Sequence, residues 1–482
     1  MDSNFVESIW SIALAWLLLL IQITGFILAG RVIMGDRSTH GTIAWAVSLV
    51  LLPLVAVPTY LLFGRNKLGS YIKSRRRLDD DFNRRQQVEA QHPAGIIDEK
   101  DEAFKQWKIL EGLTKVPLTR GNSMTFLFAG RETFDSIIEG LERAEDTILF
   151  QFFIFRDDAE GRRFTDLLKK KAKAGVRVYF MVDAIGSRQL SPLFFKGLEE
   201  AGVKTGVFLP GRTIRGRLRL NFRNHRKVVL VDGKEAWIGG NNIGLEYVGK
   251  HPKFGHWRDT HVHVRGPVVN AIQLAFLEDW FWVTRDMPDL NWKAADQQPA
   301  DVRALCLATG PADSEDNCTL AYVHMINQAR KRLWIHSPYF VPSEEVIIAL
   351  QLAALRGVDV RILLPGKSDK WLVWISSFYF SASTRLRKVR FYRYKRGFFH
   401  SKLLLVDDEL VSVGTVNFDN RSFRINFEMT LILEDKRLAE ECLQQMKQDF
   451  KEAVEDPDDP LASKSFLFRL AAHTVRLLSP LL

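Results

Sequence analysis

Two stretches of the sequence place a histidine and a lysine two residues apart at the head of an apolar run. One is HRKVVLVDGKEAWIGGNN, which starts at His225, and the other is HSKLLLVDDELVSVGTVN, which starts at His400. Side chains alternate along a strand, so each histidine shares a face with its lysine, Lys227 or Lys402. Burying two such cations is costly unless an anion pairs with them. The pattern therefore predicts a buried site for an anionic group.

Each copy continues in register beyond the apolar run. Asp232 and Asp407 end the run, a tight turn follows, and Asn242 and Asn417 close the pattern. Lysine and asparagine suit phosphate oxygens, and a neutral histidine is a nucleophile or base near pH 7. Two facing copies would let one histidine attack phosphorus while the other protonates the leaving oxygen. Either copy alone is also compatible with an ordinary buried histidine, but their agreement along the whole pattern favours chemistry.

The elements that must position these residues also occur twice. TILFQFFIFRDD (147–158) resembles RLWIHSPYFVPS (332–343), and AGVRVYFMVD (174–183) resembles RGVDVRILLP (356–365). Strand, helix and strand at this spacing predict an α/β fold with a mostly parallel sheet. We expect two similar α/β halves, over residues 121–300 and 301–455.

The first 64 residues are expected to form two transmembrane helices. The runs from Ser8 to Gly30 and from Ser38 to Gly64 contain no Asp, Glu, Lys or Arg, and each can cross a hydrocarbon core of about 30 Å. A cleaved signal peptide is disfavoured because MDSNFVES lacks basic residues and a second apolar run follows at once. A buried helical pair in a soluble domain is a weaker alternative still.

The basic residues around these runs predict the orientation of the chain. Arg65 and Lys67 open a basic cluster that continues to residue 77, whereas only Arg31 and Arg37 lie between the runs. The positive-inside rule places the bulk of the protein, and with two crossings also the N-terminus, in the cytoplasm. Arg31 and Arg37 weaken this prediction, because two crossings place them outside the cytoplasm. Residues 65–120 are expected to form a charged juxtamembrane connector, either a solvated helix or a linker.

Composition restricts the partners without choosing among them. Lys plus Arg number 67 against 57 Asp plus Glu, a net charge of +10, which predicts an anionic partner such as nucleic acid, an acidic membrane or a phosphorylated substrate. The three cysteines are far apart and predict neither a disulfide framework nor a CxxC metal site. Residues 211–227 form a basic run that is either a surface for lipid head groups or a solvated loop. Its arginines before His225 are Arg212, Arg215, Arg217, Arg219 and Arg223.

Two further segments have alternative interpretations. His251, His256, His261 and His263 cluster in the sequence, but their spacing is not that of a zinc site, and no metal is predicted. The C-terminal tail, residues 456–482, is amphipathic. It is expected to be either an interfacial membrane helix or a helix that packs on the core.

The paired segments resemble the two HxKxxxxD signatures of the phospholipase D superfamily. Within it, RNHRKVVLVDG, WRDTHVHVRGP and GTVNFDNRSF, together with two N-terminal spans, resemble bacterial cardiolipin synthases. The resemblance implies two α/β halves packed about a pseudo-twofold with the active site between them. It implies that His225 forms a phosphatidyl-enzyme intermediate and that His400 is the general acid and then the general base. Lys227, Lys402, Asn242 and Asn417 would hold the phosphoryl oxygens, with Asp232 and Asp407 more structural than chemical.

The resemblance also implies one acid in each half that orients the histidine of the other half. In register are Glu428, expected beside His225, and Asp259, expected beside His400; otherwise both are ordinary surface carboxylates. No metal or other cofactor is implied.

The reaction implied joins two molecules of phosphatidylglycerol, the anionic phospholipid partner, and releases glycerol, at the bacterial inner (cytoplasmic) membrane in which the protein is embedded. Phosphatidylethanolamine is an alternative acceptor, and the oligomeric state stays open. A phospholipase D that hydrolyses or exchanges head groups would use the same residues. A superfamily nuclease is disfavoured by the apolar N-terminus and the lack of a nucleic-acid module, and a lipid-binding scaffold would leave both signatures idle.

Overall fold

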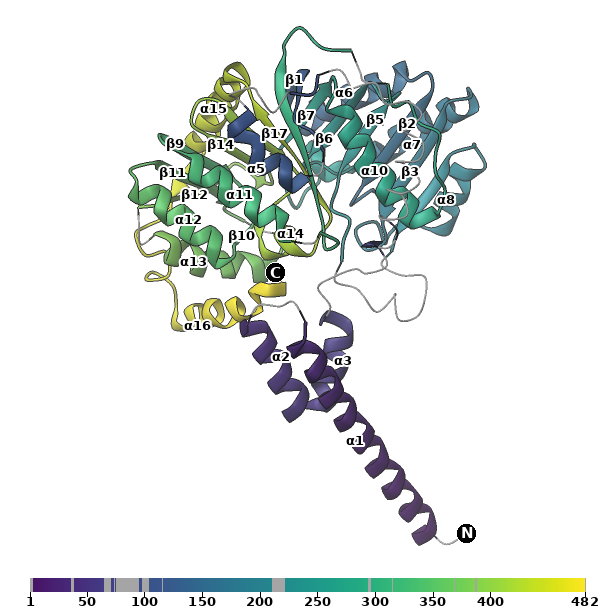
Figure 1. The fold of residues 1–482 in the computed structure, drawn as a ribbon, viewed down its shortest axis with the longest axis vertical. Coiled ribbons are helices and arrows are strands. Elements are labelled where there is room, and N and C mark those ends of the chain that lie inside the picture. The colour runs from purple at the N-terminus through teal and green to yellow at the C-terminus, as the bar shows by residue number, and fades with distance from the viewer. Residues whose placement is uncertain are drawn as a thin grey trace. The chain divides into compact units, whose positions relative to one another are not determined.

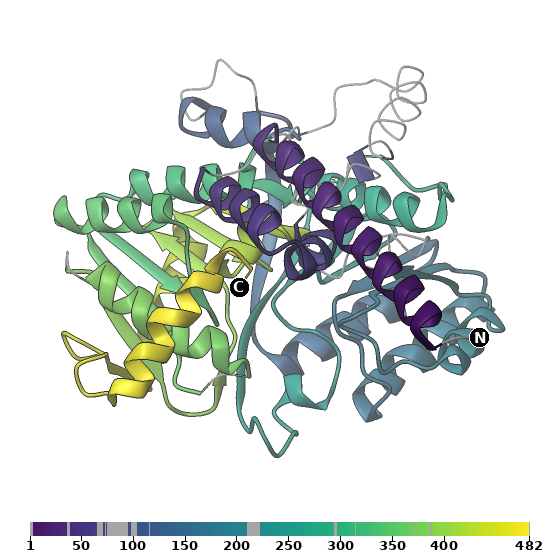
Figure 2. The same ribbon diagram turned by 90° about the horizontal axis from the view of Figure 1, so that it is seen from below.

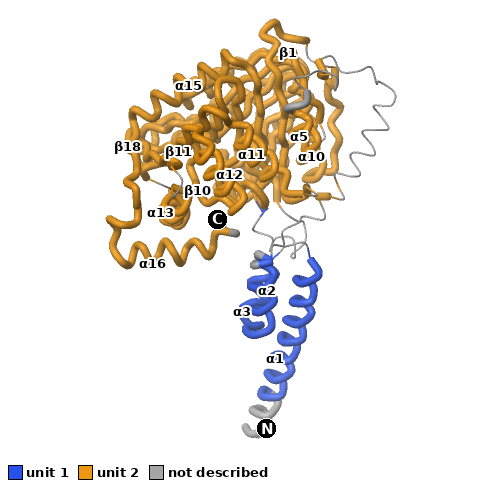
Figure 3. The backbone as a smooth tube through the Cα atoms, turned by 60° about the vertical axis from the view of Figure 1, so that its left-hand side comes forward, with its two compact units in different colours: residues 1–68, 210–222 blue, residues 69–209, 223–482 orange. Residues whose placement is uncertain are grey.

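The computed structural model describes most of the chain as two compact units. The described residues are 3–35, 39–64, 71–72, 74, 95–97, 104–114, 116–209, 222–293, 296–313, 315–367, 369–385 and 388–481. One unit comprises residues 1–68 and 210–222, and the other residues 69–209 and 223–482 (Figure 3). Most of the predicted connector lies outside the described residues. So do four arginines of the predicted basic surface: Arg212, Arg215, Arg217 and Arg219.

The described residues of the N-terminal unit form the helices α1 (Ser3–Ile33), α2 (Thr39–Leu51) and α3 (Pro53–Phe63). Among the described residues, one helix is long and apolar enough to cross a membrane, over Trp10–Ile33 of α1. The second predicted span is instead divided into α2 and α3. Leu52 leaves the helical region, at φ −131° and ψ 52°, because the ring of Pro53 disfavours a helical conformation in the residue before it. The expectation of one long second helix is therefore corrected.

The larger unit is built on one continuous sheet to which 16 strands of the described residues belong. On one side of its middle lie β1 (Thr119–Ala129), β2 (Thr147–Phe152), β3 (Arg177–Asp183), β4 (Lys204–Phe208), β5 (Val228–Val231), β6 (Glu235–Gly239) and β7 (Trp257–Arg265). On the other lie β8 (Val302–Thr309), β9 (Arg332–His336), β11 (Asp359–Pro365), β12 (Arg390–Tyr394), β14 (Leu403–Val406), β15 (Leu410–Gly414) and β17 (Glu428–Glu434). Short strands complete it: β13 (Phe398–Phe399) beside β7 and β18 (Ala453–Glu455) at the β12 edge, while β10 (Phe340–Val341) and β16 (Phe418–Asp419) pair separately.

Both sides of the sheet use the same strand order outward from the middle. The order is β1-β7-β6-β5-β2-β3-β4 on one side and β8-β17-β15-β14-β9-β11-β12 on the other (Figure 1). β2, β3 and β4 are parallel, as are β9, β11 and β12, but the inner strands are antiparallel. The prediction of a mostly parallel sheet is therefore wrong for the inner strands. Tight hairpins join β5 to β6 and β14 to β15, and such short connections allow only antiparallel pairing.

Helices cover both faces of this sheet (Figure 1, Figure 2). In the first half these are α6 (Gly130–Arg143), α7 (Ala159–Lys173), α8 (Pro192–Glu199), the short η1 (Leu245–Val248) and α10 (Val269–Thr284). With the second half pack α5 (Phe104–Thr114), α11 (Asn317–Gln328), α12 (Glu344–Leu355), α13 (Trp371–Arg385), α14 (Asn420–Arg424), α15 (Lys436–Lys451), α16 (Phe466–Val475) and η2 (Arg476–Leu481). One core, between the sheet and helices α10 and α15, contains side chains of both halves and joins them into a single body.

Candidate active site

Each His-x-Lys segment crosses from its own half to the other. The amide of His225 donates to the carbonyl of Phe427 at 2.9 Å, and the amide of Phe427 donates to the carbonyl of Arg223 at 2.8 Å. In the second copy β13 pairs with β7, and the amide of His400 donates to the carbonyl of Arg258 at 2.8 Å. The regular strands β5 and β14 begin only after the lysines. The sequence pattern predicted that both motifs lie inside those strands. Instead, residues 225–227 and 400–402 are extended segments that bridge the two halves, and we call them straps.

The straps set each histidine beside a carboxylate of the opposite half. Nδ1 of His225 lies 2.9 Å from Oε2 of Glu428, and Nδ1 of His400 lies 2.6 Å from Oδ2 of Asp259. All four residues are buried. A carboxylate at Nδ1 fixes the proton there and leaves the lone pair of Nε2 for a substrate. The structure thus brings together both pairs of residues that the resemblance implied.

Both motif lysines are buried at the same place. Nζ of Lys227 donates to the carbonyl of His225 at 2.6 Å, and Nζ of Lys402 donates to the carbonyl of His400 and lies 2.9 Å from its Nδ1. Burial lowers the pKa of Lys402 to about 8 and lowers that of Lys227 strongly, although Glu428 and Asp259 favour the charged forms. Burial therefore disfavours the charged forms of both lysines, and a bound anion would favour them again.

Burial, assisted by the nearby cations, keeps both histidines neutral. Burial, followed by Lys227, Lys402 and His400, lowers the pKa of His225 well below its usual value. Burial and Lys402 lower the pKa of His400 to about 4, against the opposing effect of Asp259. A bound phosphodiester would supply the missing negative charge and raise the pKa of both rings. The site can thus offer a neutral nucleophile and acquire a proton donor when an anion enters.

The two carboxylates have different environments. Burial raises the pKa of Glu428 to about 7, even though Lys227 and hydrogen bonds from Thr415 and Asn426 favour its charged form. Burial also disfavours charge on Asp259, but Lys402 and His400 outweigh it and bring the pKa of Asp259 down to about 2. Burial thus leaves Asp259 the stronger anion of the two, whereas Glu428 takes up a proton more readily.

The two motif asparagines lie at the ends of β6 and β15, and both are buried. Oδ1 of Asn242 accepts from the amide of Ile154 at 2.9 Å, and its Nδ2 donates to the hydroxyl of Tyr247 at 3.2 Å. This leaves Asn242 one N–H for a phosphoryl oxygen. Oδ1 of Asn417 has no hydrogen-bond partner among the described residues. Their predicted role as phosphate ligands stays a prediction.

The structure does not bring Asp232 and Asp407 to the histidines. Strands β5 and β14 separate each aspartate from its lysine. The carboxylate of Asp232 accepts from the amides of residues 145, 146 and 147, and that of Asp407 from those of residues 330, 331 and 332. Both have positive φ, 54° and 53°. They organise the turns before β2 and β9, because strand length keeps them away from the histidines. Their structural rather than catalytic role stays a prediction.

An ion pair behind the first motif was not predicted from the sequence. Arg226, between His225 and Lys227, is buried; its Nη1 donates to Oδ2 of Asp279 at 2.9 Å and its Nε to the carbonyl of Glu428 at 3.1 Å. Asp279 also accepts from the Tyr71 hydroxyl at 2.7 Å. The sequence contained one signal for this ion pair: Asp279 lies in the apolar stretch LEDWFW. An acid in such a stretch is buried only when a cation or hydrogen-bond donor pairs with it.

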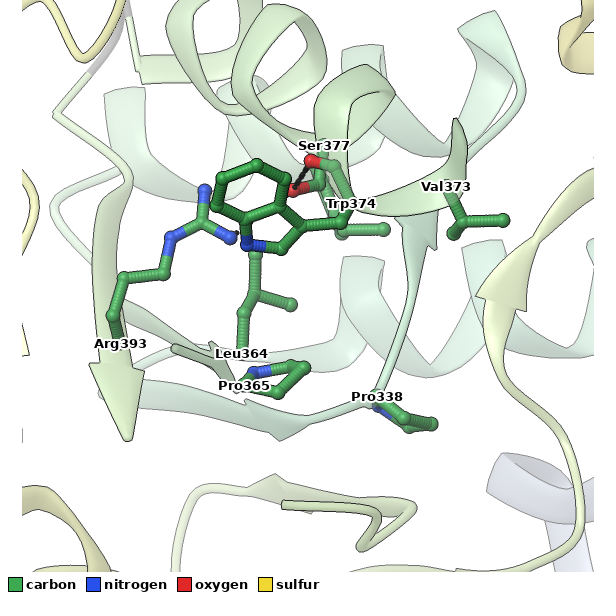
Figure 4. A pocket seen from close by; sticks show the side chains of 8 residues that line it. Pro338, Leu364, Pro365, Val373, Trp374, Ser377 and Arg393 are labelled. Carbon is green, nitrogen blue, oxygen red and sulfur yellow. Dashed lines mark hydrogen bonds between the residues drawn. The ribbon is translucent and has the colours of Figure 1, made fainter. Parts of the chain in front are cut away.

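The clustered histidines and a small pocket lie apart from this chemistry. Nε2 of His263 lies 2.9 Å from Oε2 of Glu235, and His261 accepts a hydrogen bond from the amide of Asn241. In the described part of the chain, no group of three or more His, Cys, Asp or Glu could hold a metal ion. The pocket between Trp374 and Arg393 has a cavity volume of about 10 Å³ (Figure 4), room for a single water and not for a lipid.

Comparison with known proteins decides the family. The family model described as cardiolipin synthase, PLD-like domain matches residues 137–251 and 322–452. Cardiolipin synthase A of Pseudomonas putida (strain GB-1) is 39% identical over 476 residues, covering 97% of this chain and 98% of the relative. The chain belongs to the cardiolipin synthase family. Cardiolipin synthase A of Pseudomonas aeruginosa (strain LESB58) is 40% identical over 474 residues, covering 97% of this chain and 96% of that relative.

Two further matches fit this family. Residues 23–65 match the model described as Phospholipase_D-nuclease N-terminal. The crystal structure of phosphatidylserine synthase from Haemophilus influenzae Rd KW20 aligns with a TM-score of 0.59 at 14% identity, covering 78% of this chain and all of that one. At this identity the likeness concerns the fold alone. It supports a mixed α/β body, and the two segments matched by the PLD-like family model are the repeats within it.

Proposed function

We propose that this protein is a cardiolipin synthase that transfers a phosphatidyl group from one phosphatidylglycerol to another and releases glycerol. The observation that carries the proposal is the pair of buried histidines, each held through Nδ1 by a carboxylate of the opposite half and each contacted by the lysine of its own motif. This arrangement suits in-line exchange at a phosphodiester. The names of the curated relatives support cardiolipin as the product.

In the first step Nε2 of His225 attacks phosphorus, and the bond from phosphorus to the glycerol head-group oxygen breaks. His400 gives its proton to that oxygen, so glycerol leaves neutral. Lys227 and Lys402 neutralise the non-bridging oxygens as negative charge builds on them. Because the leaving oxygen must face the general acid, we place His225 and His400 on opposite sides of the phosphorus. A pseudo-twofold relation between the halves, supported by their common strand order, supplies that geometry.

In the second step a hydroxyl of another phosphatidylglycerol attacks phosphorus, and the bond from phosphorus to His225 breaks. His400, now neutral, takes the proton of that hydroxyl and returns to its starting state. One phosphodiester replaces another, so the exchange needs no nucleotide. Water at the same position would give phosphatidic acid, so the ratio of transfer to hydrolysis depends on which acceptor reaches His400.

We further propose that the protein is embedded in the bacterial inner membrane with its catalytic body on the cytoplasmic side. The supporting observations are the apolar helix over Trp10–Ile33 and the basic residues that begin at Arg65 and Lys67. Residues 39–63 would then either cross the membrane again, making the protein multi-pass, or enter it and return to the same side.

The test uses purified full-length protein in phosphatidylglycerol vesicles, with cardiolipin, free glycerol and phosphatidic acid followed together. Cardiolipin and glycerol rising in equal amounts supports the proposal, and adding phosphatidylethanolamine then defines the acceptor range. Phosphatidic acid alone would identify a phospholipase D, and no lipid product at all would reject both. The H225A protein is the matched control, and it should form none of the three products.

A further inference from the structure

The C-terminal segment presents an apolar face that the rest of the body does not cover. Phe466, Leu467 and Leu470 of α16 are 68%, 74% and 52% exposed, and Leu477 of η2 is 70% exposed. Single exposed leucines are common on protein surfaces, but a contiguous group on one short segment marks an interaction site. Figure 2 shows α16 as the yellow helix on the outside of the second half.

The opposite face of α16 is fixed to the body. Ala472 is fully buried and packs in one cluster with Ile375 and Phe378 of α13 and with Leu461. The sequence offered an interfacial helix or a core-packing helix as alternatives. The structure shows a helix that packs through one face and exposes another, so its apolar surface is held rigidly rather than on a free tail.

The positive charge of the C-terminal segment favours an anionic partner. Residues 463–482 include Lys464, Arg469, His473 and Arg476 but no Asp or Glu. Trp371, 64% exposed at the start of α13, adds an aromatic side chain of the kind that favours the membrane interface. Apolar residues beside basic ones, without acids, are typical of helices that lie on anionic lipid.

We propose that α16, η2 and Trp371 form a docking face for an anionic phospholipid bilayer. The leucines and Phe466 would enter the region between head groups and acyl chains, and the basic side chains would contact lipid phosphates. The proposed lipid substrate is not needed for this inference, which concerns binding to a surface. The expectation that docking raises activity on lipid bilayers does rest on the proposed function.

The C-terminal segment is hydrogen bonded to the segment that carries Asn417 and leads to Glu428. Nδ2 of Asn420 donates to the carbonyl of Ser479 in η2 at 3.1 Å and to that of Val341 at 3.1 Å. Asn420 opens α14 three residues after Asn417, and the same short segment leads to Glu428. The docking face is therefore attached to the loop that carries one predicted phosphate ligand, so docking would hold the site at the surface where its lipids reside.

The first experiment places an environment-sensitive fluorophore on a single introduced cysteine in the full-length protein, reconstituted in nanodiscs that contain phosphatidylglycerol. The native cysteines, Cys306, Cys318 and Cys442, are buried, so an exposed cysteine is labelled selectively. The L467C label should be quenched by lipids that carry a nitroxide on the acyl chain, and quenching should weaken in phosphatidylcholine alone. The matched control is I109C, an exposed apolar position on α5, which should stay unquenched. Equal, solvent-like emission at both positions would overturn the proposal.

The second experiment separates docking from chemistry. The variant L467E/L470E should lose about tenfold in activity on phosphatidylglycerol bilayers, because two charged groups replace apolar contacts with lipid. It should keep its activity on short-chain phosphatidylglycerol dissolved as monomers. Loss of both activities would overturn docking and indicate a structural role for α16. If wild-type protein makes no cardiolipin from either substrate, the proposed function fails while the quenching result still stands.

A different observation concerns residues 39–63. Trp45 of α2 and Tyr60 of α3 have ring centroids 5.2 Å apart, on either side of the break at Leu52, so the two helices fold back on each other (Figure 1). At 1.5 Å per residue, helices of 13 and 11 residues are about 20 and 16 Å long, both short of a core of about 30 Å. The tip between them is apolar and exposed, over Leu51–Val55.

The tip of this hairpin lies against the middle of α1. Nε2 of Gln22 donates at 3.0 Å to the carbonyl of Val50, whose usual helical partner is lost at the break. A side chain at Gly25 would approach the carbonyl of Leu49 to 2.3 Å, so only glycine permits this contact. The remainder of the hairpin packs on Leu28, Ala29 and Val32. It therefore covers only the C-terminal half of α1.

We infer that α2 and α3 form a re-entrant hairpin whose tip ends inside the bilayer, and that α1 is the crossing helix. The chain then leaves the hairpin on the side where it entered. Arg31, Arg37 and the basic cluster from Arg65 all fall on that side, while residues 1–8 contain acids but no Lys or Arg. The hairpin thus removes the conflict with the positive-inside rule that two crossings create. It places the N-terminus on the opposite side, in the periplasm.

Single cysteines tested with a membrane-impermeant maleimide in intact cells distinguish the arrangements. The hairpin predicts labelling of S3C and protection of M34C, which follows α1, until the cells are lysed. Two full crossings predict the reverse pattern, and that result would overturn the inference. Lysed cells provide the control that both cysteines are reactive.

Discussion

The two histidine–carboxylate pairs have the same architecture but different chemistry around the acid. In one half Gly240 stands beside Asp259, and a Cβ there would lie 2.0 Å from its Oδ1. At the equivalent position of the other half Thr415 donates to Oε2 of Glu428. Asp259 fits because the neighbouring residue is a glycine without a side chain, whereas Glu428 accepts a hydrogen bond from the side chain of Thr415. The repeat therefore conserves the straps while the immediate surroundings of each acid differ.

The electrostatic consequence distinguishes the two histidines. Asp259, with a pKa lowered to about 2, offers His400 a permanent negative charge, so His400 retains a pKa of about 4 despite burial. Glu428, with a pKa raised to about 7, is a weaker anionic partner for His225, whose pKa burial and the nearby cations lower well below its usual value. The ring that more readily holds a proton suits the acid and base, and the other suits the nucleophile. This difference supports the same assignment of roles as the family resemblance.

The largest expected effect is on the histidines themselves. H225A should lose about ten-thousand-fold or more with every donor, because no covalent intermediate forms. H400A should lose about a hundredfold to ten-thousand-fold with phosphatidylglycerol. Its first step should recover with a phosphatidyl donor whose leaving group is p-nitrophenolate, a far weaker base that departs without a proton. This donor should give a burst of p-nitrophenol, although the second step still lacks its base. Release of p-nitrophenol and of glycerol measures both; rescue of H225A instead of H400A would exchange the two roles.

A smaller effect is expected from the carboxylates. D259N should slow the reaction about a hundredfold, because His400 loses a fully charged partner. E428Q should slow it less, about tenfold at pH 7, because Glu428, whose pKa burial raises to about 7, is a weaker anionic partner for His225 than Asp259 is for His400. Rates measured beside melting curves separate orientation from unfolding. Equal losses in the two variants would show that the difference in pKa has no catalytic consequence.

The sequence predicted the chemistry of these pairs better than their construction. The two His-x-Lys copies, the two halves and the hairpins after Val231 and Val406 all follow from local patterns. The straps do not, because the hydrogen bond from His225 to Phe427 joins residues far apart in the chain. Periodicity indicates that a segment is extended, but it does not identify the segment with which it pairs.

Two other errors have local causes. The apolar run around Pro53 has the length and composition of a membrane span, and the sequence does not show whether a proline kinks such a helix or ends it. Tertiary packing on Gln22 and Gly25 decides this here. The role of Arg226 was not predicted, because the pattern indicates only that His225 and Lys227 share a face. Arg226 points the other way, toward Asp279.

The pH dependence is expected to follow Glu428 and not Asp259. Below pH 7 Glu428 gains a proton and can no longer stabilise charge on His225, so kcat/KM should fall as the pH is lowered and level off near the rate of E428Q. The D259N protein should keep this acidic limb at a lower rate, because an acid with a pKa of about 2 does not titrate in this range. In E428Q the limb should disappear. Its persistence there would assign the titration to another group.

The smallest expected effect concerns Asp232 and Asp407, which share a role in turns but differ in burial. Asparagine tolerates their positive φ, so D232N and D407N remove charge without adding backbone strain. D232N should lower the free energy of unfolding by about 1–3 kcal/mol, because buried amides lose a charged acceptor. D407N should cost less, since its surroundings are partly exposed to water. Both should retain nearly wild-type kcat; a large loss of kcat at unchanged stability would return these aspartates to the catalytic machinery.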